Sequence, residues 1–519
     1  MRRSRSYRAG LAVAATILLF TRPARADVKL PAIIGSHMVL ESGMPLTIWG
    51  WADAGEDVVV SIAEIKASAK ADENGDWLVK LPPIPATSDP LEMTVSGKNT
   101  IKLTDVLVGE VWLGSGQSNM QWSVSASNNP AEEIAAADNP QIRLFLVPLV
   151  AAGKPAKDVD ASWTVCSPQT VAPFSAVCYY FGRELHKALN VPVGMVASSW
   201  GGTRIEPWIP PVGYDEVPEL AGELQQIESQ RAGYQAGLKS KLAEMKAWLE
   251  AAQKAADAGQ PIPDAPAIPA NPFNSSGGFT GLYNGMIHPL APFTIRGALW
   301  YQGEANVGQG MHYRDLMRGL IRGWRSVWGQ GDFPFLFVQL APYRYGGHPQ
   351  ALPELWEAQA ATLNVPNVGM AVTTDISDIN DIHPRNKQEV GRRLALWALA
   401  RFYSQNELVY SGPLYESMTV EGGRIRVKFR HAAGGLAVRG DKPLSWFSIA
   451  AADKKFVPAQ ATIDGETVVV EAAEVGTPVA VRFGWHQTAE PNLMNKSGLP
   501  ASPFRTDDWS DAVSAPPPQ

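Results

Sequence analysis

The sequence predicts an α/β protein in which helices cover both faces of a central parallel sheet, with a β domain at each end of the chain. Strand-like runs alternate with helical periodicity from residue 106 to residue 403, the pattern of a parallel sheet. Short β runs separated by turns lie before and after this stretch. The 519 residues suffice for three or four domains of roughly 150 residues each. With 45% hydrophobic and 18% charged residues, the composition excludes a disordered chain or a coiled coil.

Residues 1–26 have the features of a secretory signal sequence. They contain six arginines and no acidic residue, an apolar run over 11–20, and the small-residue motif Ala-Arg-Ala before Asp27. About 20 apolar residues are needed to cross a bilayer, so this run is too short to be an anchor. We therefore expect cleavage before Asp27, a secreted or periplasmic protein, and no membrane association after cleavage.

The expected elements divide the mature chain into three domains. Residues 27–104 predict an N-terminal β-sandwich-like domain, with strands at 46–51, 58–62 and 77–81 and a hairpin signal at Asn74-Gly75. Residues 105–405 predict the α/β domain, and residues 406–519 a C-terminal β domain with strands at 424–429, 467–471 and 479–483. Central strands are expected at 106–113, 143–147, 193–198, 297–301, 335–340 and 369–374, and helices at 176–189, 312–327, 354–363 and 387–403.

An insertion at about 210–281 interrupts the α/β pattern. Its 217–256 portion is rich in Ala, Glu, Gln and Lys, which predicts a helix, and the proline-rich run that follows cannot continue one. We expect a helical excursion or lid.

Charge and cysteine content narrow the classes of partner. Loss of the six leader arginines takes the formal charge from −6 to −12, which disfavours nucleic acid as a partner. Cys166 and Cys178 either pair in an oxidising compartment or are two buried thiols, and spacing alone leaves both open. No HExxH, CxxC pair or EF-hand spacing occurs, so we expect neither a metal nor another cofactor. The oligomeric state cannot be inferred from the sequence.

Two serines are candidate nucleophiles. The strand at 106–113 runs into GSGQSNMQW, which delivers Ser118 to a helix start at the carboxyl edge of the sheet, where ligands bind in open α/β folds. The alternative for Ser118 is a plain N-cap. Ser199 lies in Ala-Ser-Ser-Trp-Gly, a degenerate form of the G-x-S-x-G elbow. The glycines after it, Gly201 and Gly202, are better placed to donate backbone N–H groups to an oxyanion, or they simply form a turn.

His383 is the candidate base. It follows the strand at 369–374 and precedes a helix for which Asn386 and Glu389 have capping-box spacing, so it is expected at the same sheet edge as Ser118. Any of Asp375, Asp378 and Asp381 could orient the imidazole.

A third loop, WYQGEAN, follows the strand at 297–301 and carries Gln302, Glu304 and Asn306. Several strand ends therefore converge on one site. The alternative is local hydrogen bonding within the loop.

In these motifs the chain resembles the sialate O-acetylesterase family, secreted carbohydrate esterases of the SGNH hydrolase superfamily. The resemblance rests on GQSNM, SWGGTRIEPW, WYQGEAN, DIHPRNK and NLMNKSGLPASPFRTD and covers nearly the whole mature chain. It implies an SGNH-type fold, Ser118 as nucleophile and His383 as base. It also implies oxyanion donors from Ser118, Gly201, Gly202 and the WYQGEAN segment, where Gln302 and Asn306 are the candidates. We expect sugar contacts from Gln117, Trp200, Arg204 and Glu304, with Arg204 pairing with Glu206 as the alternative.

The sequence departs from the superfamily pattern in two motifs, one around the nucleophile and one before the histidine. G-D-S is replaced by G-Q-S, and the acid expected three residues before His383 is Asn380. We expect Asp381 to complete the triad, with Asp375, Asp378 or a Ser-His dyad as alternatives. The predicted function is removal of O-acetyl groups from carbohydrates, either sialic acid or a plant glycan such as xylan. The alternatives are a non-catalytic carbohydrate-binding protein and an esterase of other acyl esters that uses Ser199.

Overall fold

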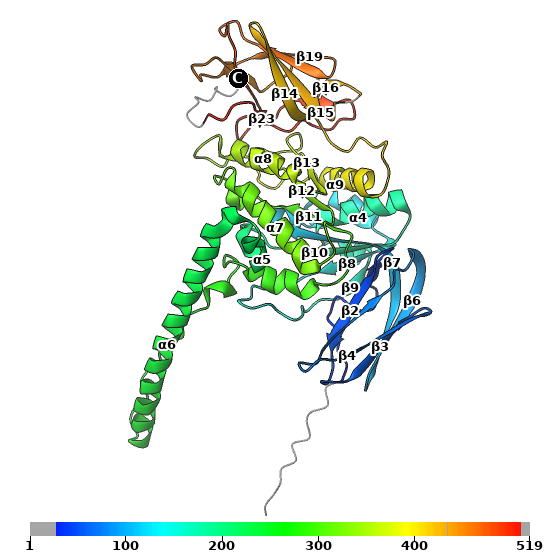
Figure 1. Ribbon diagram of the computed structural model, residues 1–519, viewed down its shortest axis with the longest axis vertical. Coiled ribbons are helices and arrows are strands. Elements are labelled where there is room, and N and C mark those ends of the chain that lie inside the picture. The colour runs from blue at the N-terminus through cyan, green and yellow to red at the C-terminus, as the bar shows by residue number, and fades with distance from the viewer. Residues whose placement is uncertain (1–26, 433, 510–519) are drawn as a thin grey trace, which may run out of the picture.

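A computed structural model describes residues 27–432 and 434–509, so the expected signal segment lies outside the described residues. The centre of the protein is a sheet with the strand order β13-β12-β11-β7-β10-β8-β9 (Figure 1). All neighbours are parallel except β8 and β9, which are antiparallel. The strands are β7 (Thr100–Gly116), β8 (Asn139–Leu146), β9 (Trp163–Cys166), β10 (Val193–Ser199), β11 (Gly297–Tyr301), β12 (Phe335–Val338) and β13 (Val368–Ala371).

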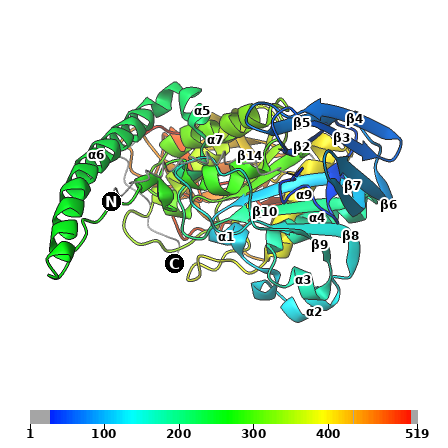
Figure 2. The ribbon, with the colours of Figure 1, turned by 90° about the horizontal axis from the view of Figure 1, so that it is seen from below.

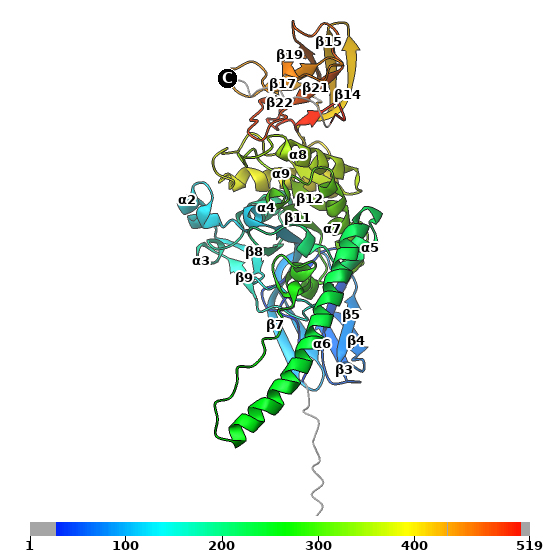
Figure 3. The same cartoon turned by 90° about the vertical axis from the view of Figure 1, so that its left-hand side faces the viewer.

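The central strands are buried along their length because helices cover both faces of the sheet. Every residue of β10, β11 and β12 is buried, as expected for parallel strands with two covered faces. Two helices, α4 and α9, pack together on one side of the sheet, and α7 and α8 lie on the other (Figure 3). The predicted α/β class is confirmed. The helices are α1 (Ser118–Gln121), α2 (Pro130–Ala135), α3 (Pro168–Val171), α4 (Ala176–Leu189), α5 (Pro211–Asp215), α6 (Ala221–Asp257), α7 (His312–Trp328), α8 (Ala351–Ala361) and α9 (Lys387–Phe402).

The N-terminal β unit is continuous with the central sheet. Strand β1 (Val39–Glu41) pairs parallel with β7, and β6 (Thr87–Ser96) pairs antiparallel with its first half. Next to β6 lies β3 (Asp57–Ile62), which pairs with β4 (Ile65–Lys70) on its other edge. The expected domain boundary at residues 104 and 105 falls inside β7. This strand begins half-exposed in the N-terminal unit and becomes fully buried as it enters the α/β layer.

Asn74-Gly75 forms a turn, but the strands that it joins do not pair with each other. It connects β4 to β5 (Asp76–Leu81), and β5 pairs instead with β2 (Leu46–Trp51). The expected hairpin is therefore wrong. Asn and Gly favour a turn here, but strand pairing depends on contacts distant in sequence, and these pair β5 with β2.

The insertion forms a long helix that projects from the body of the molecule (Figures 1 and 2). Of the 37 residues of α6, only Ile227 and Ala252 are buried. Such a helix lacks an apolar stripe wide enough to pack against a core.

Both cysteines lie in the α/β layer, where Cys166 and Cys178 are buried free thiols. Among the described residues, no helix has the length and apolar character that crossing a bilayer requires.

The C-terminal β unit has a hydrophobic core of its own. The C-terminal sheets are formed by β14 (Leu414–Glu421), β15 (Arg424–Arg430), β20 (Thr467–Glu471) and β19 (Gln460–Asp464); by β18 (Val457–Pro458), β17 (Phe447–Ala450), β21 (Ala480–Phe483) and β23 (Phe504–Arg505); and by β16 (Leu436–Val438) and β22 (Leu493–Asn495).

Candidate active site

A tight turn at the end of β7 presents Ser118 at the carboxyl edge of the sheet. Gly116 has φ +139°, and a Cβ atom there would lie 2.2 Å from the carbonyl oxygen of Tyr301, so only glycine fits. The backbone N–H of Gln117 donates to the same carbonyl at 3.0 Å. Ser118 then begins α1 and is half-buried, so its hydroxyl stays within reach of a substrate.

The loop between β13 and α9 brings His383 to this serine. The distance from His383 Nε2 to Ser118 Oγ is 2.9 Å, although 265 residues separate them in sequence. Asn386 caps α9 by accepting a hydrogen bond from the backbone N–H of Glu389 at 3.1 Å, which ends the loop. The two side chains are thus within proton-transfer distance.

The imidazole of His383 is held against an aromatic ring. Trp122 stacks on it with ring centroids 4.8 Å apart and an interplanar angle of 18°, and the indole N–H of Trp122 donates to the carbonyl of Ala126 at 2.8 Å. Burial and the nearby Lys387 cation lower the pKa of His383, and the Asp381 carboxylate partly offsets them. A neutral imidazole is the form that can accept a proton.

Of the three candidate carboxylates, only Asp381 lies beside His383. Its Oδ1 atom is 3.6 Å from His383 Nδ1, which is too long for a hydrogen bond, and it accepts the backbone N–H of His383 at 2.9 Å. Asp375 instead forms a two-pronged ion pair with Arg393, at 2.7 and 2.6 Å. Asp378 accepts the backbone N–H of Asn380 at 2.9 Å.

Ser199 ends β10 and lies opposite Gly116 in the parallel register. It is 6% exposed, and the serine that contacts the imidazole is Ser118.

The glycines after Ser199 differ in their surroundings. A Cβ atom on Gly201 would lie 3.3 Å from Ser118 Cβ, so this backbone is adjacent to the candidate nucleophile. Its N–H donates to Gln121 Oε1 at 2.8 Å. Gly202 has φ +74°, and no atom lies within 4 Å of an added Cβ, as expected of a turn residue.

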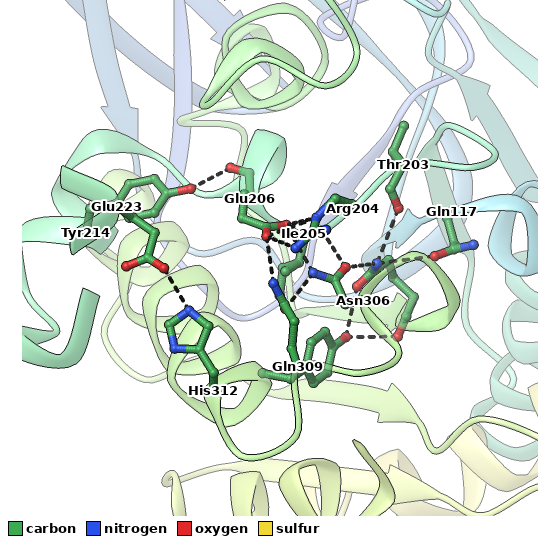
Figure 4. A network of polar contacts seen from close by, with 12 residues as sticks. Gln117, Thr203, Arg204, Ile205, Glu206, Tyr214, Glu223, Asn306, Gln309 and His312 are labelled. Carbon is green, nitrogen blue, oxygen red and sulfur yellow. Dashed lines mark hydrogen bonds and ion pairs between the residues drawn. The ribbon is translucent and has the colours of Figure 1, made fainter. Parts of the chain in front are cut away.

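Asn306 belongs to a polar network with Gln117 and Thr203 (Figure 4), and hydrogen bonds join Gln302 to this network. Gln302 Nε2 donates to Asn306 Oδ1 at 2.6 Å and to Gln117 Oε1 and the Thr203 carbonyl, each at 3.2 Å. Asn306 Nδ2 donates to Glu206 and to Gln309, at 3.1 and 2.8 Å. Both amides are therefore engaged with protein acceptors.

Comparisons with known proteins identify the family. A family model described as carbohydrate esterase, sialic acid-specific acetylesterase, matches residues 271–400, a stretch that includes WYQGEAN and His383. Sialate O-acetylesterase from Homo sapiens is 28% identical over 537 residues, or 94% of each chain. Sialate O-acetylesterase from Rattus norvegicus is 30% identical over 521 residues, which covers 92% of this chain and 93% of the rat protein. The chain belongs to the sialate O-acetylesterase family.

A solved structure agrees with this assignment along nearly the whole chain. A carbohydrate acetylesterase from Xanthomonas citri shares 35% identity and a TM-score of 0.79, over 93% of this chain and 100% of that one. The resemblance inferred from the motifs is thus confirmed, and this member of the sialate O-acetylesterase family is a carboxylic ester hydrolase.

The residues expected to contact sugar lie in different settings within this sialate O-acetylesterase fold. Arg204 is exposed and pairs with Glu206, with 2.7 Å between Nη2 and Oε1. Although burial acts to raise it, hydrogen bonds from Arg204 and Asn306 hold the pKa of Glu206 below its ordinary value. Gln117 is buried and accepts from Gln302, whereas Trp200 is half-buried. Glu304 Oε1 accepts a hydrogen bond from Asn119 Nδ2.

Sequence reasoning missed Asn119 and Lys387, which contact each other next to the Ser118–His383 pair. For Lys387 the sequence does carry a signal. It is the first residue of the helix expected at 387–403, and a cation at the positive end of a helix dipole is unfavourable. Such a placement needs a compensating partner.

Proposed function

We propose that this esterase removes acetyl groups from O-acetylated carbohydrates with Ser118 as nucleophile and His383 as general base. The observation that carries the proposal is the 2.9 Å distance between His383 Nε2 and Ser118 Oγ at the carboxyl edge of the sheet. The names of the relatives, sialate O-acetylesterase and carbohydrate acetylesterase, support the acyl group and the substrate class.

In the first half of the reaction, Nε2 of neutral His383 takes the Ser118 proton while Oγ bonds to the acetyl carbonyl carbon. The π electrons of the carbonyl move to its oxygen and form an oxyanion. When this oxyanion collapses, the bond to the sugar oxygen breaks, and the sugar takes the proton from the imidazolium. In the second half, His383 activates a water molecule, which attacks the acetyl-serine and releases acetate.

Backbone donors are best placed for the oxyanion. The N–H of Ser118 is at the start of a helix, where such groups lack intrahelical partners, and the backbone of Gly201 lies beside Ser118. Gly201 must exchange its bond to Gln121 for the oxyanion when substrate binds. Gln302 and Asn306 do not donate to the oxyanion, because their amide donors are engaged within the network. They hold the loops around Ser118 in place. Gly202 gives the loop its turn.

Asp381 plays a supporting electrostatic part in this proposal. Its carboxylate favours the imidazolium that forms during each half-reaction, and its hydrogen bond to the backbone N–H of His383 fixes the loop.

We further propose a secreted or periplasmic location from the signal features of residues 1–26. The expected substrates are O-acetylated sialic acid or an acetylated plant glycan.

Acetate release tests the substrate class. Purified protein is offered O-acetylated sialic acid, acetylated xylan and acetylated pectin, and acetate is measured against time. We expect release from at least one of these sugars, and Ser118→Ala should lower kcat by at least about a thousandfold. Binding of an acetylated sugar without release would instead indicate a carbohydrate-binding protein. Cleavage of simple aryl esters alone would indicate another acyl substrate.

A further inference from the structure

Three polar side chains form a cluster beside the catalytic pair: Asn119 and Lys387, which are buried, and Glu304, which is half-buried with a buried Oε2 atom. We refer to them as the buried polar cluster. Lys387 is fully buried, and its Nζ donates to Asn119 Oδ1. The amide nitrogen of Asn119 donates to Glu304 Oε1 and to the carbonyl of Ile382, the latter at 3.0 Å. The cluster thus joins α1, the WYQGEAN loop and the loop between β13 and α9, residues 372–386, which we call the histidine loop.

Asn119 connects the two segments that must stay in register for proton transfer. It follows Ser118 directly, and its acceptor Ile382 directly precedes His383. A single amide therefore bridges the nucleophile and the base through their neighbours. A displacement of about 1 Å between such groups can cost a hundredfold in rate.

Lys387 is an unusual residue for this position. Its Nζ lies over the rings of Trp122 and Tyr301, at 5.8 and 5.2 Å from their centroids. Burial lowers the pKa of Lys387 to about 7, although the carboxylates of Glu304 and Asp381 act in the opposite direction. Within the described residues, Glu304 Oε2 is buried and has no hydrogen-bond partner.

We propose that the buried polar cluster positions Ser118 against His383, and that the Lys387 cation favours the neutral imidazole that accepts the serine proton. This inference rests on the proposed function and adds Asn119 and Lys387 to it as positioning residues. Neither touches the reacting atoms.

The charged groups around the site determine the sign of the effect. His383 faces Lys387 from α9 and Asp381 from its own loop, while the uncharged ring of Trp122 covers one face. Lys387 faces Glu304 and Asp381. Because a nearby cation disfavours protonation of the imidazole, removal of the cation should raise the pKa of His383. The imidazole would then stay protonated, and inactive as a base, up to a higher pH.

Lys387→Gln separates charge from hydrogen bonding because the amide can still donate to Asn119. We expect the acid limb of the kcat/KM profile to move to higher pH. The ring signals of His383 in histidine-labelled protein, assigned with His383→Ala, should titrate with the same upward shift. Lys246→Met on exposed α6 removes one positive charge far from the site and should change neither measurement.

Asn119→Ala tests the positioning half. It should lower kcat about tenfold to a hundredfold with little change in KM and no loss of the folded circular dichroism spectrum. Wild-type kcat in Asn119→Ala would overturn the positioning role of the cluster. A His383 titration in Lys387→Gln that matches the wild type would overturn the effect of the Lys387 charge. If Lys387→Gln does not fold, Lys387→Met provides the same titration test. Wild-type acetate release and its loss in Ser118→Ala are measured alongside, so failure of the proposed function is distinguished from failure of this inference alone.

Discussion

At the scale of single residues, the candidate base is oriented mainly by groups other than a carboxylate. The ring of Trp122 stacks on His383, and the nearest carboxylate oxygen is 3.6 Å from Nδ1. Asp381 is also partly exposed, with 42% of its side chain accessible, so water screens its charge. His383 therefore depends less on its acidic neighbour than the histidine of a closely hydrogen-bonded triad.

This arrangement predicts a mild effect of Asp381→Asn. The amide oxygen can still accept the backbone N–H of His383, so we expect kcat/KM to fall about tenfold, compared with about 10⁴ in kcat for a directly bonded triad aspartate. Loss of the negative charge lowers the pKa of His383 further, so the acid limb of the profile should move to lower pH. Steady-state kinetics across pH checks both. A loss near 10⁴ would mean that Asp381 bonds the imidazole during turnover.

At the scale of elements, the strand ends could be predicted from the sequence, but the pairing of side chains between them could not. Residues Ser118, His383 and Gln302 follow runs of apolar residues, and the carboxyl ends of parallel strands share one edge. Nothing local indicates that Arg393 of α9 engages Asp375, or that Lys387 reaches back to Asn119 across 268 residues. These contacts depend on tertiary packing, so the sequence alone cannot assign a role to each aspartate.

The turn after β7 gives a prediction at this scale. In Gly116→Ala the new methyl group would overlap the carbonyl oxygen of Tyr301, and the positive φ adds strain of about 1–3 kcal/mol. We expect a lower midpoint of thermal unfolding and a loss of esterase activity, since Ser118 lies two residues further on.

Gly422→Ala is the matched control for this substitution. Gly422 also has a positive φ, +64°, but no atom lies within 4 Å of an added Cβ. It should cost about 1 kcal/mol of stability in the C-terminal unit and leave kcat unchanged. Equal activity in the two variants would show that the turn geometry does not position the nucleophile.

At the scale of the whole molecule, the N-terminal β unit is continuous with the central sheet, whereas the C-terminal unit forms separate sheets that contact the α/β domain. The N-terminal unit shares β7 with the central sheet, and Arg296 joins them by pairing with Glu41 and Glu110, at 2.7 and 2.8 Å. The C-terminal unit contacts the histidine loop: Arg439 Nη1 donates to the carbonyl of Asp375 at 2.8 Å, and Glu490 accepts from Ser377 at 2.7 Å. The geometry at Ser118 and His383 thus depends on segments from three parts of the chain.

The most direct test of Ser118 as the nucleophile is to identify the residue that carries the acetyl group during turnover. The protein is mixed with an aryl acetate, quenched with acid in the pre-steady state, digested and analysed by mass spectrometry. If Ser118 is the nucleophile, one acetyl group is added to the peptide that contains Ser118, and this addition disappears in Ser118→Ala. An acetyl group on the peptide that contains Ser199, retained when Ser118 is replaced, would contradict it.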